Sequence, residues 1–308
     1  MQIHAPELVM VRETLYALTI AGYTVVGVAL LFNLVVIVVF LASKQLRIKY
    51  YFFVFTLALT DAVSAAALIL LIIIGGVFLR ALLEISHTVL RLNVLFVAVN
   101  RLLALMITPP ARYDTMVTLG RMVVVYVLMW VVSALIYLPL TYTGSPLTIR
   151  FIQPLIGLVI LTVAAILYLV VFRKIASYRP PLASTSGISE KDEQTGTRIR
   201  QTRHLMITFT LILAVSCLCW LPAAVASFMM YFSSSGNALD LGNGFLVYFR
   251  FSALFAISYS AINPFIYWWR LAEFREALYG MICCWRTKPS AVSAEASISM
   301  ETVVEQAK

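Results

Sequence analysis

The sequence predicts an all-α membrane protein, a bundle of seven transmembrane helices followed by a short amphipathic eighth helix. Hydrophobic residues make up 62% of the 308 residues and charged residues 12%, whereas a soluble domain usually carries about 25% charged residues. The mean hydropathy is +0.94. Apolar blocks long enough to cross a bilayer recur along the chain, which predicts burial in lipid.

Each apolar block is long enough for one membrane-spanning helix, which needs about 20 residues. Backbone inside lipid must satisfy its own hydrogen bonds, so these blocks are helices and not open strands. The predicted spans are 14–43, 50–74, 77–106, 122–142, 149–172, 205–232 and 245–268. Gly75 and Gly76 predict a tight turn after the second span. The polar stretch 177–200 is rich in Pro and Ser, which predicts a mobile loop.

The positions of Lys and Arg predict the orientation in the membrane. The net charge is +9, but the basic residues lie in short connections beside apolar spans, which favours a membrane over nucleic acid as their partner. The loops at 44–49, 107–121 and 173–204 and the tail are the basic ones, so they are expected in the cytosol. We therefore expect a plasma-membrane protein with an extracellular N-terminus at 1–13, the bundle and amphipathic helix at 14–285, and a disordered cytosolic tail at 286–308.

A second kind of helix follows the last span, in the sequence WWRLAEFREALYGMICCW. Its apolar residues recur at helical spacing, with charged residues largely on the other side, which predicts a helix lying along the inner leaflet. These apolar positions are Leu271, Phe274, Leu278 and Met281. Cys283 and Cys284 end the segment at the membrane surface, where palmitoylation is expected. The alternative is two free cytosolic thiols.

Polar and special residues within the apolar spans are costly in lipid and usually functional. They occur in a recurring order along the spans: Asn33 in the first, Asp61 in the second, Arg101 at the end of the third, Trp130 in the fourth, Pro154 in the fifth, Cys219–Pro222 (CWLP) in the sixth and Asn263–Tyr267 (NPFIY) in the seventh. In this order the pattern resembles the rhodopsin-like (class A) G-protein-coupled receptors, over roughly residues 14–285. The resemblance implies a receptor, not an enzyme, that transmits binding of a small ligand to a heterotrimeric G protein. Arrestin and membrane lipid are further expected partners.

The resemblance also implies which residues carry the change of conformation: Asn33, Asp61, Trp220, Pro222, Ser260, Asn263, Pro264 and Tyr267. A carboxylate at the depth of Asp61 must be paired, protonated or ion-bound, and Asn33, Ser260 and Asn263 are its expected polar partners. Related receptors place sodium here, but Leu90 stands where one hydroxyl ligand is usual, which argues against it. No other cofactor or metal is expected.

The chain departs from this family at several positions. Asn100 precedes Arg101 where the family commonly has an acid, so the charge-assisted bond that restrains the arginine is missing. We expect raised basal activity, with Asn100 and Arg101 both contacting the G protein. Thr162 stands near the usual fifth-helix tyrosine. The outer connections are short and lack the usual cysteine bridge, which favours a small molecule or a lipid as ligand.

A charged stripe runs along the third span, where Arg80, Glu84, His87 and Arg91 share one helix face. Four ionisable groups cannot all face lipid, so they point into the bundle, where the family binds ligands. With Trp220 and Arg250 they make up the predicted ligand-binding set. The excess of arginine favours an anionic group on the ligand. The alternative is an internal network in which Glu84 neutralises Arg80 or Arg91 and nothing binds.

Two other classes of function remain open from the sequence. A receptor-fold scaffold or decoy without signalling is favoured by the altered neighbourhood of Arg101. A small-solute transporter would use the charged stripe as its path, and it predicts broken helices and repeated halves, which the sequence does not show. The sequence contains no catalytic constellation, which disfavours an enzyme.

Overall fold

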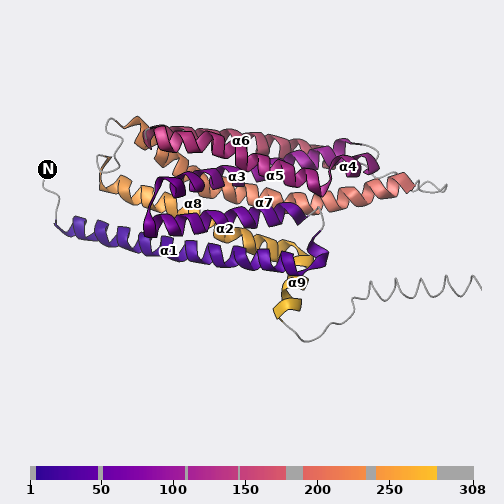
Figure 1. Ribbon diagram of the computed structural model, residues 1–308, viewed down its shortest axis with the longest axis horizontal. Coiled ribbons are helices and arrows are strands. Elements are labelled where there is room, and N and C mark those ends of the chain that lie inside the picture. The colour runs from indigo at the N-terminus through magenta and orange to yellow at the C-terminus, as the bar shows by residue number, and fades with distance from the viewer. Residues whose placement is uncertain are drawn as a thin grey trace, which may run out of the picture.

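The computed structural model describes residues 5–47, 51–107, 110–144, 146–177, 190–233 and 241–282. Every regular element within these ranges is a helix (Figure 1). In chain order they are α1 Ala5–Ala42, the short 3₁₀ helix η1 Lys44–Leu46, α2 Phe52–Ile74, α3 Val77–Met106, α4 Pro110–Met116, α5 Leu119–Thr143, α6 Pro146–Ala176, α7 Glu190–Phe232, α8 Asn243–Arg270 and α9 Ala272–Ile282.

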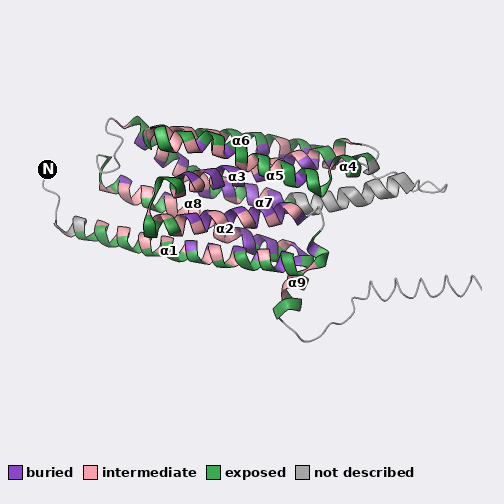
Figure 2. Ribbon diagram, in the orientation of Figure 1, coloured by how far each residue is buried: buried purple, intermediate pink, exposed green. Residues whose placement is uncertain are grey.

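Seven of the described helices are long and apolar enough to cross a membrane: α1, α2, α3, α5, α6, α7 and α8. Exposed positions recur along the outer helices of the bundle (Figure 2). Many of these positions hold large apolar side chains, such as Leu135 at 71% exposure and Leu218 at 67%. Soluble monomers rarely expose apolar patches larger than a few hundred Å². The predicted seven-helix membrane bundle is therefore confirmed.

The long helices lie side by side, with α3 near the centre of the bundle (Figure 1). Helix α3 packs against α2, α5, α6 and α7, while α8 packs against α1, α2 and α7. The elements η1, α4 and α9 lie at one end of the bundle, called here the α9 end, and the α2–α3 turn lies at the other. A side chain on the inner face of α3 can therefore meet residues from several helices.

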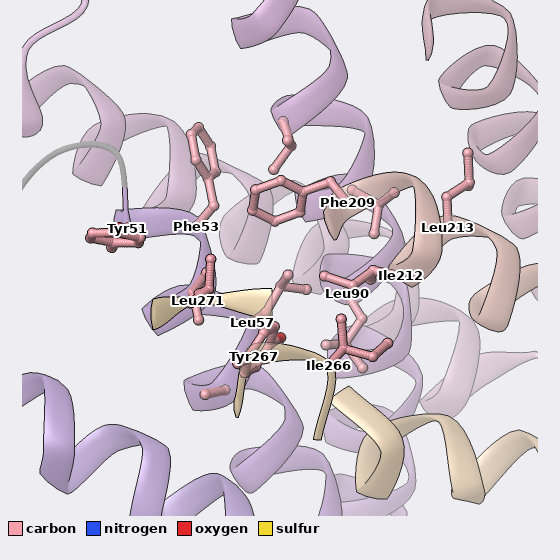
Figure 3. Close-up of a cluster of buried hydrophobic side chains, with 14 of the residues drawn as sticks. Tyr51, Phe53, Leu57, Leu90, Phe209, Ile212, Leu213, Ile266, Tyr267 and Leu271 are labelled. Carbon is pink, nitrogen blue, oxygen red and sulfur yellow. The ribbon is translucent and has the colours of Figure 1, made fainter. Parts of the chain in front are cut away.

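The apolar core lies in the half of the bundle toward the α9 end, where α2, α3, α7 and α8 meet (Figure 3). Leu57 of α2, Phe209 of α7 and Tyr267 of α8 are completely buried there, at 0% exposure. Interiors are packed as densely as organic crystals, so this core fixes how the four helices sit against one another. The polar side chains on the same four helices are therefore held in fixed positions relative to one another.

The α2–α3 turn depends on its two glycines. Gly75 has φ 68° and Gly76 φ 109°, and side chains with a Cβ rarely adopt such backbone angles. The turn predicted from the glycine pair is confirmed. It lets α3 begin immediately after α2, with both helices antiparallel and in contact.

Two boundaries differ from the sequence prediction. Helix α1 begins at Ala5, well before the predicted start at residue 14, and α7 begins at Glu190. The prediction that 177–200 is entirely a loop is therefore wrong for residues 190–200. The segment after Glu190 is polar but rich in good helix formers. Once the apolar part of α7 has nucleated, each further residue adds one hydrogen bond at little cost.

The amphipathic helix after the last span is confirmed as α9. Its inward residue Phe274 is 2% exposed, and Leu271, directly before the helix, is 0% exposed. Tyr51, directly before α2, lies beside Glu273 of α9. Its burial, and to a smaller extent the Glu273 carboxylate, raise the pKa of Tyr51 above its ordinary value. Cys283 and Cys284, the predicted lipidation sites, lie outside the described residues.

Candidate ligand site and conformational switch

A cavity of about 370 Å³ opens inside the bundle, between α3 and the helices α2, α6, α7 and α8. Ligand pockets typically measure roughly 300–1,000 Å³. Most of the lining is apolar, and its polar members come mainly from α3, α7 and α8. The lining residues are Leu68, Leu83, Glu84, His87, Leu90, Arg91, Gln153, Ser216, Trp220, Ala223, Ser227, Phe249, Ser252, Ala253, Ala256, Ile257 and Tyr259.

Arg91 and Trp220 are in direct contact in the wall of this cavity. The Arg91 guanidinium carbon lies 3.8 Å from the centroid of the Trp220 ring, a cation–π geometry. Arg91 is only 4% exposed, and its buried Nη1 has no hydrogen-bond partner. A buried cation without a direct ion pair, as Arg91 is among the described residues, is costly, so an anion would be favoured here.

Only part of the charged stripe of α3 lines the cavity. Glu84, His87 and Arg91 line it, as predicted for one face of α3. Arg80 and Arg250 are exposed and do not line it, because Arg80 lies in the first turn of α3 and Arg250 on the outward side of α8. Within the described residues Glu84 forms no ion pair with Arg80 or Arg91, although both are near enough to act on its charge. The internal network expected as the alternative is not formed as a direct ion pair.

Asp61 is the centre of a separate polar cluster between α1, α2 and α8. It is 0% exposed. Asn263 Nδ2 donates to its Oδ2 at 2.8 Å, and the Ser260 hydroxyl donates to its Oδ1. Asn33 Nδ2 donates instead to the backbone carbonyls of Ala29 and Ser260, both at 2.9 Å. Two of the three expected partners, Ser260 and Asn263, thus bond to the Asp61 carboxylate. Asn33 bonds to the backbone of Ser260 and not to the carboxylate. The expectation that Leu90 disfavours a sodium ion at Asp61 stays a prediction.

A second, smaller cavity of about 40 Å³ lies between the two sites. His87, Leu90 and Tyr259 line both cavities, and the smaller one reaches Ser260, which bonds to Asp61. The Arg91 region and the Asp61 cluster are therefore neighbours along the bundle. A rearrangement at one has a short route to the other through α8.

The prolines of α7 and α8 lie inside continuous helices. Proline has no N–H to donate, so one carbonyl a turn earlier loses its usual partner. The Pro222 carbonyl accepts a hydrogen bond from the Tyr248 hydroxyl of α8 at 3.0 Å. Pro264 is buried beside Asn263 and Tyr267. Pro222 thus lies where α7 meets α8, whereas Pro264 lies on α8 beside α1 and α9.

At the α9 end, Asn100 and Arg101 are 3% and 2% exposed. The Tyr113 hydroxyl, from α4, donates to Asn100 Oδ1 at 3.0 Å. Tyr168 of α6 is buried within electrostatic reach of Arg101. Thr162, which the sequence placed near the usual fifth-helix tyrosine, is exposed. That expectation stays a prediction, and Tyr168, which lies later in α6, is a buried tyrosine near Arg101.

Three residues at these sites were missed from the sequence. Gly157 of α6 lies directly against Trp220, where a Cβ would fall 2.9 Å from ring atom Cζ2. Tyr113 binds Asn100, and Gln153 adds an amide to the cavity. A glycine within an apolar helix and a tyrosine in a short connection are weak signals on their own. Only the packing shows which partner each one meets.

A further polar network was also missed, between α2, α3 and α5. Thr56 donates to Asn93 Oδ1 at 3.1 Å, and the hydroxyls of Thr60 and Tyr126 lie 2.8 Å apart. Tyr126 also stacks edge-to-face on Trp130, with ring centroids 6.4 Å apart. The fourth-span tryptophan thus supports a network that ties α5 to α2.

This combination of seven antiparallel helices, a buried polar core and a cavity within the bundle defines a seven-helix receptor. The family model of the seven-transmembrane receptors of the rhodopsin family matches residues 32–267. The chain therefore belongs to the rhodopsin family of G-protein-coupled receptors, and it is a receptor and not an enzyme.

Curated relatives agree with this assignment. The chain is 28% identical to cannabinoid receptor 2 of Homo sapiens over 286 residues, covering 86% of this chain and 77% of the relative. It is also 28% identical to the receptor of the same name from Mus musculus over 278 residues, covering 82% and 77%. The identity to that of Rattus norvegicus is 28% over 278 residues, covering 82% and 74%.

Proposed function

We propose that this receptor binds a small amphipathic ligand with an anionic head group in the central cavity and signals to a heterotrimeric G protein. Binding would shift an existing equilibrium between two arrangements of the bundle. We place the receptor in the plasma membrane with its N-terminus outside and the α9 end in the cytosol. Arrestin and membrane lipid belong to the proposed partners.

The orientation is supported by basic residues gathered at the α9 end. Cytosolic connections carry an excess of Lys and Arg. The described residues that provide it are Lys44, Arg47, Arg112, Arg121, Arg173, Lys174, Arg270 and Arg275. An antibody against a tag before α1 is expected to stain intact cells, and staining only after permeabilisation would contradict this orientation.

The observation that carries the ligand proposal is Arg91, a buried cation in the cavity wall that has no ion pair in the part of the chain that the structure describes. A guanidinium can hold a carboxylate or phosphate with two parallel hydrogen bonds. Glu84 in the same wall balances the formal charge without contacting Arg91. An anionic ligand would supply the missing contact.

The remaining lining supports an apolar tail on the ligand. Phe249, Ala253, Ala256 and Ile257 of α8 form one wall of the cavity. The α2–α3 and α5–α6 connections are too short to offer a folded ligand a surface of its own. The relatives carry the name cannabinoid receptor 2, so cannabinoids are one class of molecules to test here.

Raised basal activity is part of the proposal. Asn100 is neutral, and its side-chain oxygen accepts from Tyr113. It therefore cannot supply the charge-assisted bond with which an acid would hold Arg101. With less restraint, a larger share of receptors would occupy the active arrangement without ligand.

The test uses full-length receptor in lipid nanodiscs with a purified heterotrimeric G protein, and nucleotide exchange as readout. The probes are two pairs that differ mainly in charge: oleate with oleyl alcohol, and 1-oleoyl lysophosphatidate with 1-oleoylglycerol. We expect the anionic member of at least one pair to act at a concentration about tenfold lower, the equivalent of roughly 1.4 kcal/mol. Arg91→Gln should abolish that difference, and Arg250→Gln, outside the cavity, should preserve it.

The other outcomes distinguish the alternative functions. Equal potency of charged and neutral probes, retained in Arg91→Gln, would contradict an anion site. Binding of a probe without any nucleotide exchange, with or without ligand, would favour a decoy. Ion or solute flux through receptor-containing vesicles would favour a transporter.

A further inference from the structure

We infer that Arg91 and Gly157 are positioning residues for Trp220: Arg91 covers the face of the indole and Gly157 leaves room for its edge. A ligand's anion releases the ring by taking the guanidinium away from it. The release step rests on the proposed function, whereas the positioning of the ring does not.

The contact with Arg91 is specific in geometry. The guanidinium carbon stands 3.8 Å from the Trp220 ring centroid, and a cation over an indole face is the strongest of the aromatic cation contacts. Nη1 of Arg91 is buried with no hydrogen-bond partner. Arg91 has no ion pair within the described residues, and Glu84 acts on it only from a distance, so the ring is the partner that the guanidinium touches.

Gly157 leaves the space on α6 that the edge of the Trp220 ring occupies. A Cβ on Gly157 would lie 2.9 Å from Trp220 Cζ2 and 3.0 Å from Cζ3, and closer still to Cη2. Real Cβ atoms do not approach this closely, so any larger residue here displaces the ring. Gly157 is itself buried on α6. Trp220 of α7 is thus held between α3 and α6.

The cavity supplies the space for release. Arg91 and Trp220 both line it, so a ligand anion that reaches Arg91 competes directly with the indole for one cation. A carboxylate or phosphate forms charge-assisted hydrogen bonds with guanidinium, which are stronger than a contact with a neutral ring. Glu84 lines the same cavity, and its negative charge repels an incoming anion. Release of the ring therefore requires a ligand that gains further binding energy from its apolar tail.

The experiment follows Trp220 directly. Full-length receptor labelled with 5-fluorotryptophan is placed in nanodiscs, and the Trp220 fluorine resonance is assigned by its loss in Trp220→Phe. We expect Arg91→Met to shift this resonance and to raise nucleotide exchange without ligand. Arg91→Lys, which keeps a cation near the ring, should give a smaller shift. Arg250→Met, an exposed arginine outside the cavity, should leave both readouts unchanged.

Gly157 is tested by coupling to Trp220. Gly157→Ala should shift the Trp220 resonance and change ligand-free exchange in the native background, but it should not change exchange in a Trp220→Phe background, where the smaller ring removes the overlap. Equal effects in both backgrounds would overturn the positioning role of Gly157. An unshifted resonance in Arg91→Met would overturn that of Arg91.

The release step is tested with a single matched pair of probes. 1-Oleoyl lysophosphatidate should move the Trp220 resonance toward its position in Arg91→Met, and 1-oleoylglycerol should not. No movement with the lysophosphatidate, although it binds, overturns release. Shifts in the variants without nucleotide exchange in any sample would support the positioning of Trp220 and overturn the proposed signalling.

Discussion

The Asp61 cluster and the Arg91 region of the cavity are both buried and polar, but they differ in how fully their groups are satisfied. At the Asp61 cluster both carboxylate oxygens accept hydrogen bonds, from Ser260 and Asn263. At the cavity, Arg91 is equally buried but has an aromatic face as its partner and an unpaired Nη1. The first site is closed and joins helices. The second is left incomplete beside open space, which is what a ligand site requires.

The largest expected effect is the loss of Asp61. Asp61→Ala leaves the Ser260 hydroxyl and the Asn263 amide without their acceptor, and each such buried group costs about 1–3 kcal/mol. We expect the free energy of unfolding to fall by about 2–6 kcal/mol, measured by thermal unfolding of receptor in nanodiscs. Thr162→Ala, an exposed position on α6, is the control. If the two variants unfold alike, the Asp61 cluster does not hold the bundle together.

Replacing Arg91 is expected to change the free energy of unfolding in the opposite direction. Arg91→Met removes a buried charge that lacks an ion pair and keeps most of the side-chain volume. Replacing a buried ionic group by an apolar one of similar size is often neutral or stabilising, by about 1–4 kcal/mol. The same unfolding measurement should show equal or higher stability. A fall as large as that of Asp61→Ala would mean that Arg91 is a structural group with a partner of its own.

The hydrogen bond between Asn100 and Tyr113 tests whether the polar groups at the α9 end are fully satisfied, as at the Asp61 cluster, or left incomplete, as at Arg91. Asn100→Asp keeps the acceptor for the Tyr113 hydroxyl and adds a charge next to Arg101. A charge-assisted hydrogen bond is worth about 1.5 kcal/mol, so ligand-free nucleotide exchange should fall by up to about tenfold. Tyr113→Phe, which removes only the donor, should not lower it. Unchanged exchange in Asn100→Asp would contradict raised basal activity.

The smallest expected effect is at the margin of the Asp61 cluster. Asn33 bonds to the carbonyls of Ala29 and Ser260 and not to the carboxylate. The bond to Ala29 stays within α1, so Asn33→Ala should mainly lose the bond to Ser260 and cost only about 0.5–1.5 kcal/mol, the usual net value of one neutral hydrogen bond. Thermal unfolding of Asn33→Ala beside Asn263→Ala measures the difference. Equal losses would show that Asn33 supports Asp61 as directly as Asn263 does.

The sequence by itself determined the seven spans, the α2–α3 turn, the amphipathic α9 and the family. These follow from local chemistry: hydrocarbon demands long apolar helices, and positive φ at Gly75 and Gly76 demands glycine. The need to satisfy scarce polar groups in lipid identified Asp61, and the family resemblance named Asn33, Ser260 and Asn263 as its partners, of which Ser260 and Asn263 bond to it directly.

Only the tertiary structure decided which members of a helix face reach the cavity. Arg80 and Arg91 share one face of α3, yet only Arg91 is buried against Trp220, because depth along the bundle matters as much as direction. It also decided that Gly157 borders Trp220 and that Tyr168 faces Arg101. These contacts depend on the register between helices, which is set by how their side chains pack together and not by the residues of any single helix.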